Sequence, residues 1–143
     1  ENKKKMNHDV SDISWNPMKI IMKTNLEWRV RLFHDKMSVE LLKKIIEEYV
    51  KFGKENNFKP ILSFLPQKDD LIFIKNNYHF YNDFIKKLKN IENLIFVDVT
   101  EKLLEESDLD ILYSDNNDYG GHYSKHGNEK VSSIFYSSLK NLT

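Results

Sequence analysis

The chain has 143 residues, the size of one ordinary domain, and can bury one sizeable hydrophobic core. Its 22 basic and 22 acidic residues cancel, so the net charge favours no nucleic-acid partner. The absence of cysteine excludes disulfides, thiolate nucleophiles and cysteine-ligated zinc. No apolar run reaches the roughly 20 residues that a membrane span requires, so we expect none.

The N-terminal third contains one clear helical pattern. Residues 1–16 are polar and weakly patterned, and we expect a mobile arm or the end of a longer polypeptide. Residues 17–37 have mixed periodicity and are expected to be partly helical. A helix capped by Ser38 and ended by Gly53 follows, because apolar residues recur at spacings of three and four. These residues are Leu41, Leu42, Ile45, Ile46, Tyr49 and Val50.

Two short apolar runs, residues 59–66 and 93–99, have the composition of buried strands. An amphipathic helix is predicted between them, over about residues 78–91. Its aromatic residues between Tyr78 and Phe84 are expected to belong to the core rather than to a substrate pocket or a base-stacking surface. A short helix capped by Thr100 follows the second run.

The remaining elements complete an alternation of helix and strand. Residues 108–113 are expected to form a brief extended piece, and a last helix begins near Ser124. Val131, Ile134, Phe135 and Leu139 are its inward face. Such alternation predicts a single α/β domain over residues 1–143, an open, mainly parallel sheet with helices on both faces in three α/β/α layers, flavodoxin-like in type. Two strands make a poor sheet, so we expect this one to be incomplete.

The segment from residue 115 to residue 128 combines glycines with titratable side chains. It holds three of the four glycines, two histidines and two aspartates, and it lies between the last strand and the last helix. Open parallel sheets collect functional groups in such loops. His122 directly follows two glycines and precedes the expected cap of the helix. Asp118 and Asp115 lie upstream of it, so His122 is a candidate general base with a carboxylate to orient it.

A metal site is the weaker interpretation of the same residues. His126 lies four residues after His122 and, with Asp118, could be a set of ligands. Residues four apart face one another only inside a helix, however, and His122 precedes the expected cap. We therefore expect neither a metal nor a cofactor, and an exposed His126.

The stretch "DYGGHYSKHGNEKVSSIFYSSL", residues 118–139, resembles the last conserved block of the SGNH (GDSL-type) hydrolases. The order of elements over about residues 38–142 is also similar to that family. The resemblance implies a serine esterase or acyltransferase that acts on ester-linked acyl groups, such as acetyl, of a carbohydrate or lipid. It implies His122 as the general base. The family places the orienting aspartate three residues before the histidine, where this chain has Tyr119, so Asp118 is the first choice and Asp115 the second.

The nucleophile of that family lies in a Gly-Asp-Ser motif, and these residues contain none. No glycine occurs before Gly53, so the expected oxyanion groups are absent as well. We therefore expect the C-terminal part of a longer hydrolase, which has a small-molecule or glycan ester as substrate and takes its serine from the missing N-terminal part. The alternative is a non-catalytic α/β module that kept the fold for binding or assembly.

Overall fold

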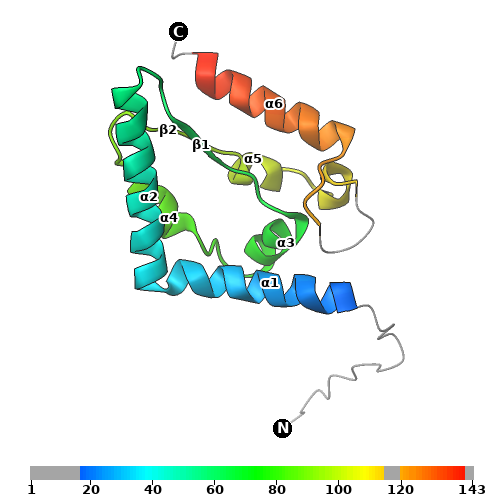
Figure 1. Cartoon of the computed structure of the whole chain (residues 1–143). Helices are drawn as coiled ribbons and strands as arrows, with labels where there is room; N and C mark the ends of the chain where they lie inside the picture. Colours follow the sequence, from blue (N-terminus) through cyan, green and yellow to red (C-terminus); the bar gives the residue numbers. More distant parts are fainter. Residues whose placement is uncertain (1–16, 115–119, 141–143) are drawn as a thin grey trace, which may run out of the picture.

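The computed structural model describes residues 17–114 and 120–140 (Figure 1). The expected mobile arm, residues 1–16, lies outside this part of the chain. In chain order the elements are α1 (Pro17–His34), α2 (Lys36–Glu55), β1 (Ile61–Phe64), α3 (Lys68–Asn76), α4 (Asn82–Lys89), β2 (Ile95–Asp98), α5 (Thr100–Leu104), the 3-10 helix η2 (Leu109–Leu112) and α6 (Lys125–Leu139). The fold is a mostly helical α/β arrangement around a small sheet.

The sheet consists of β1 and β2, which pair in parallel with Leu62 opposite Phe96. The prediction of two parallel strands is confirmed. Because successive strand residues point to opposite faces, Leu62 and Phe96 share one face, which packs against α2 and α4. Val97 points the other way, into a core formed with α3, α5, η2 and α6. Helices therefore border this two-stranded sheet on both faces.

Three of the expected helix starts were wrong, and one is that of α4, which begins at Asn82 rather than near residue 78. The long helix begins at Lys36 because the carboxylate of Asp35, not the hydroxyl of Ser38, caps it. Asp35 Oδ2 accepts hydrogen bonds from the Ser38 backbone nitrogen at 2.8 Å and from Ser38 Oγ at 2.6 Å. Thr100 is the first residue of α5 rather than its cap, and its hydroxyl donates to Asp98 Oδ1 at 2.6 Å.

Two other segments also differ from the expectation. Helix α3 was not predicted. Gln67 and Asp70 form a capping box at its start. Two of its own side chains, Leu71 and Ile74, are buried. Residues 109–112 form the 3-10 helix η2 rather than an extended piece, because the Asp108 carboxylate accepts the Asp110 backbone N–H at 2.9 Å and so begins its tight turn; Asp108 and Tyr113 on either side are extended. Leu109 and Leu112 are both buried, and their spacing of three residues equals one turn of a 3-10 helix.

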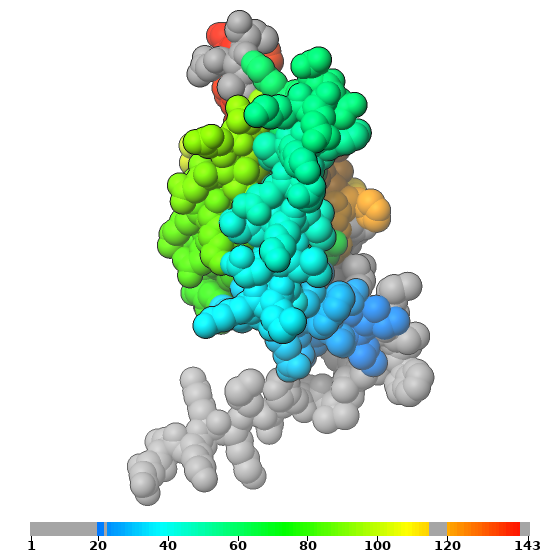
Figure 2. All heavy atoms as spheres, turned by 60° about the vertical axis from the view of Figure 1, so that its left-hand side comes forward, coloured from blue at the N-terminus to red at the C-terminus, as the bar shows by residue number. Residues whose placement is uncertain are grey.

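Helix α2 carries a wider apolar face than it buries. Figure 2 shows it along the front of the molecule, with the segment around α4 beside it. Ile46 is buried against the sheet, whereas Leu41, Ile45 and Phe52 are more than half exposed. Amphipathic spacing therefore overestimated the burial of this helix. Within the described residues, no helix has the length and apolar content to cross a bilayer.

Candidate functional site

His122 lies on the segment that connects η2 to α6, three residues before the first residue of the last helix. Its side chain is exposed, while its backbone carbonyl accepts hydrogen bonds from the backbone nitrogen of Ser114 at 2.9 Å and from Ser114 Oγ at 3.0 Å. Next to it, Tyr113 and Tyr123 form an isolated antiparallel bridge. The backbone of His122 is thus fixed while its imidazole faces outward. Asp118 and Asp115, its expected orienting acids, lie outside the described residues.

The two glycines before His122 lie against the turn that follows β1. Gly120 has a φ of 155°, a conformation that side chains disfavour, and its carbonyl accepts the backbone N–H of Lys68 at 2.8 Å. A Cβ on Gly121 would lie 3.3 Å from the side chain of Gln67. Because Gln67 ends the short turn after β1 and Lys68 begins α3, the His122 loop lies at the carboxyl end of that strand.

A pair of tyrosines fixes this loop to the same turn. The hydroxyls of Tyr113 and Tyr123 both donate to the Pro66 carbonyl at 2.8 Å, and their rings stack with centroids 5.0 Å apart. Burial raises the pKa of both phenols, that of Tyr123 to about 12, so both keep their protons near neutral pH. Both oxygen lone pairs of Pro66 are therefore occupied.

Hydrogen bonds also fix the start of α6. Ser124 is its N-cap, as expected: its hydroxyl accepts the Gly127 backbone N–H at 3.1 Å, and its own backbone N–H donates to the Leu112 carbonyl at 2.9 Å. His126 is exposed in the first turn, with Nε2 3.6 Å from Glu106 Oε1. The described residues contain no group of three potential metal ligands among histidine and the carboxylates.

Gly127 allows α6 to approach η2, and we expect alanine there to destabilise the fold. An added Cβ would overlap the Leu112 carbonyl oxygen, which is backbone and also holds Ser124. The expected loss is about 1–3 kcal/mol in the free energy of unfolding, measured by urea denaturation. Gly121→Ala is the matched control, because its Cβ meets only the flexible Gln67 side chain. Equal losses in the two variants would contradict this account.

A buried ion cluster, which the sequence did not reveal, lies on the other side of the turn. Arg29 of α1 donates from Nη2 to Asp69 Oδ2 at 2.6 Å and to Asp70 Oδ1 at 2.9 Å, and from Nε to Asp70 Oδ1 at 3.1 Å. Asp70 Oδ2 also accepts the backbone N–H of Gln67 at 2.9 Å. The only sequence signal was the capping pattern Gln67 to Asp70 after a strand, because the arginine is about forty positions away.

The carboxylate of Asp69 is incompletely paired. It is 4% exposed, and its Oδ1 has no hydrogen-bond partner among the residues that the structure describes. Burial raises the pKa of Asp69, although the Arg29 guanidinium lowers it. The folded state thus binds this proton more tightly than the unfolded state does. The contribution of Asp69 to stability is consequently present below its ordinary pKa of 3.8 and is lost as the pH rises through the raised value.

This sign can be tested with Asp69→Asn, which removes the titrating group. We expect the free energy of unfolding of the wild type, relative to that of the variant, to fall as the pH rises above about 4. Asp83→Asn is a control of opposite sign, because a hydrogen bond from Lys86 lowers the pKa of Asp83. There the wild-type advantage should shrink as the pH falls. Chemical denaturation between pH 3 and 7 gives both slopes, and parallel slopes would refute the assignment.

Hydrogen bonds connect the carboxyl end of β2 to the aromatic residues between Tyr78 and Phe84. The Tyr81 hydroxyl lies 2.8 Å from Thr100 Oγ1, which donates to Asp98 Oδ1. Phe80, Tyr81 and Phe84 are buried, as expected of core residues, whereas Tyr78 is 49% exposed and does not belong to the core. Even so, Phe80 and Tyr81 also line a pocket of about 190 Å³ beside Arg29, at the edge of the sheet that carries the His122 loop.

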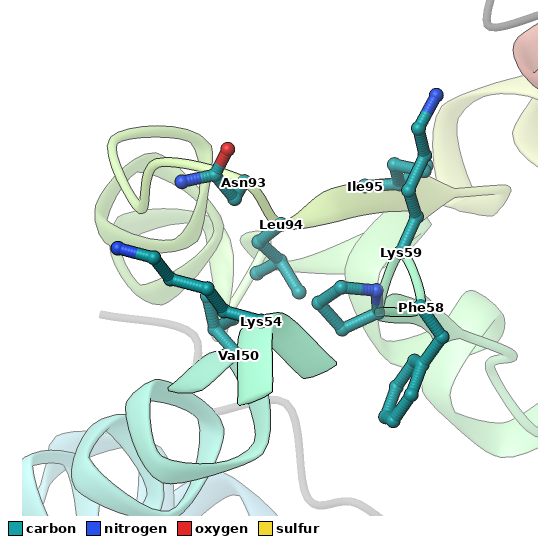
Figure 3. A pocket seen from close by; sticks show the side chains of 8 residues that line it. Val50, Lys54, Phe58, Lys59, Asn93, Leu94 and Ile95 are labelled. Carbon is teal, nitrogen blue, oxygen red and sulfur yellow. The ribbon is translucent and has the colours of Figure 1, made fainter. Parts of the chain in front are cut away.

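A larger pocket, of about 430 Å³, opens at the opposite, amino end of the strands. Figure 3 shows Leu94 at its centre, with the side chains of Lys54 and Lys59 extending away on different sides. The described residues that line it include no carboxylate and no histidine, and its titratable side chains are two lysines, which Figure 3 shows extending away from Leu94. The carboxyl edge is therefore the candidate functional site. No family model, no curated protein and no solved structure matches this chain.

Proposed function

We propose that this chain is the C-terminal part of an SGNH-type serine esterase or acyltransferase, acting on ester-linked acyl groups, such as acetyl, of a carbohydrate or lipid. His122 is its general base, and Asp118, or else Asp115, orients the imidazole. The residue pattern "GGHYSKHGN" is the origin of this proposal. The serine has to come from polypeptide outside these 143 residues, because they contain no Gly-Asp-Ser motif.

The observation that carries the proposal is the support given to His122. The histidine is exposed at the carboxyl end of β1, and its loop is attached to the β1–α3 turn through Gly120 and Tyr123. A general base must keep its position while a proton moves, and the hydrogen bonds that fix the backbone of His122 help to hold its imidazole in place. In the proposed reaction, His122 takes the proton of the serine hydroxyl as the serine attacks the ester carbonyl, and then gives it to the leaving alcohol.

We also propose that the two strands belong to a larger parallel sheet of the three-layer, flavodoxin-like kind. Parallel sheets are normally buried on both faces and contain more than two strands. Ile61 at the start of β1 is 40% exposed, and Leu41 and Ile45 of α2 have no apolar cover among the described residues. Further strands and a helix from the same polypeptide would cover these surfaces.

The test uses the protein encoded by the complete reading frame that contains these residues. We expect it to be labelled by a fluorophosphonate probe, which reacts with activated serines, and to hydrolyse p-nitrophenyl acetate. Mass spectrometry should locate the labelled serine outside residues 1–143. A labelled serine inside them would show that the nucleophile had been overlooked.

The second candidate is a non-catalytic binding or assembly module, and it is favoured by the missing nucleophile together with the exposed apolar face of α2. It predicts neither labelling nor turnover by the complete protein. The two candidates therefore give opposite results with the same probe.

A further inference from the structure

The pocket of about 190 Å³ beside Arg29 opens at the carboxyl end of β1. Its walls come from α1, from the end of β1 and the residues that follow it, from the start of α3 and from the segment before α4. The lining residues are Arg29, Phe33, Phe64, Leu65, Pro66, Asp70, Phe80 and Tyr81. The pocket is thus built from parts of the chain that are far apart in sequence and meet only in the folded state.

One turn separates this pocket from the His122 loop. Pro66 lines the pocket, and its carbonyl accepts the hydroxyls of Tyr113 and Tyr123, which flank that loop. Asp70 also lines the pocket and holds the backbone of Gln67, the residue against which Gly121 packs. A group in the pocket would therefore lie on the same edge of the sheet as His122.

The lining favours an uncharged, apolar ligand. Six of the eight lining side chains are hydrocarbon or aromatic, and the hydroxyl of Tyr81 is already bonded to Thr100. The guanidinium of Arg29 is neutralised by Asp70 and Asp69, so the cluster attracts no further anion. Nη1 of Arg29 has no acceptor among the residues that the structure describes, which leaves its two N–H groups for a neutral carbonyl oxygen.

The volume limits the size of the group. About six water molecules fill 190 Å³, and a methylene group takes about as much room as a water molecule. Resting on the proposed function, we infer that this pocket receives the acyl part of the ester substrate and that it takes an uncharged apolar chain of up to about six carbons or a single ring. The inference extends the substrate class from acetyl to longer acyl groups.

The first measurement is binding, which does not depend on catalysis. The 143-residue chain, labelled with ¹⁵N, is titrated with hexanamide, a neutral probe with a six-carbon acyl group. We expect shifts at the Arg29 side-chain Nε–H and at the Leu65 amide, and weaker shifts with hexanoate because of its charge. Leu65→Trp, at a lining position that is 52% exposed, should abolish them, whereas Tyr136→Trp, at a position of α6 that is 69% exposed and outside the lining, should not.

The second measurement is chain-length selectivity in the complete protein. With p-nitrophenyl esters of two, four, six and eight carbons, kcat/KM should peak near six, and Leu65→Trp should reduce the ratio of hexanoate to acetate about tenfold or more. Tyr136→Trp should leave that ratio unchanged. If the enzyme is active but Leu65→Trp leaves the ratio of hexanoate to acetate unchanged, the inference is wrong and the proposed function stands. If the complete protein has no activity, the proposed function fails, and with it the acyl role. The hexanamide titration then decides alone whether the pocket takes an apolar chain.

Discussion

Replacing His122 by alanine in the complete protein is expected to lower the kcat for p-nitrophenyl acetate by about 10²–10⁴-fold, the usual contribution of a general base. KM should change little, because the imidazole acts on the serine rather than on the acyl group. Labelling by fluorophosphonate should slow by a similar factor, since it depends on the same activated serine. The variant should still fold, because alanine retains the backbone carbonyl that Ser114 holds.

His126→Ala is the matched control. This histidine lies four residues further along and is also exposed, but it belongs to the first turn of α6, near Glu106 rather than near the β1–α3 turn. Its removal should leave kcat within about twofold of the wild type, well inside the range of surface substitutions. If both variants retain full activity, or both lose it, His122 is not the base that the proposed function requires.

Replacing Arg29 by methionine is expected to cost about 3–5 kcal/mol in the free energy of unfolding, because it leaves two buried carboxylates without a counter-charge. The side chains of Asp69 and Asp70 are 4% and 8% exposed, and the guanidinium between them is itself only 26% exposed. Partial burial disfavours the charge of Arg29, yet the two carboxylates outweigh it and raise the pKa of Arg29. The guanidinium of Arg29 therefore stays charged when the protein is folded.

Arg31→Met tests whether this cost belongs to the cluster. Arg31 lies on the same helix with an exposed side chain, so its replacement should cost less than about 0.5 kcal/mol. Adding Asp69→Asn and Asp70→Asn to Arg29→Met should recover part of the loss, because the buried charges then disappear together. Urea denaturation of the four proteins measures these differences. Similar losses for Arg29→Met and Arg31→Met would contradict a stabilising role for the cluster.

Sequence patterns predicted the elements whose signals are local. The strands at Ile61–Phe64 and Ile95–Asp98 follow from short apolar runs, and the start of α6 follows from Ser124. Helix α3 escaped detection because Leu71 to Ile74 are apolar in succession and show no amphipathic period. Its true signal was the pairing of Gln67 with Asp70 at the N-terminus.

The candidate site was predictable only in part, because sequence patterns reveal only signals that are local in the chain. His122 could be found because its glycines and its helix cap are adjacent in sequence. The attachment of its loop to the β1–α3 turn could not be predicted. The acceptor is the backbone carbonyl of Pro66, and every residue has such a carbonyl, so it leaves no sequence pattern. The pairing of Arg29 with Asp69 joins two side chains 40 residues apart, and no spacing rule connects them.

The double hydrogen bond to the Pro66 carbonyl also bears on the order of folding. Its two donors, Tyr113 and Tyr123, follow the acceptor by 47 and 57 residues, so closing this contact has to overcome the entropy of a long loop. The helices close local contacts much sooner. We therefore expect the His122 loop to become ordered after the strands have paired and to be released first on partial unfolding, so that the imidazole reaches its position only in a chain that has folded completely.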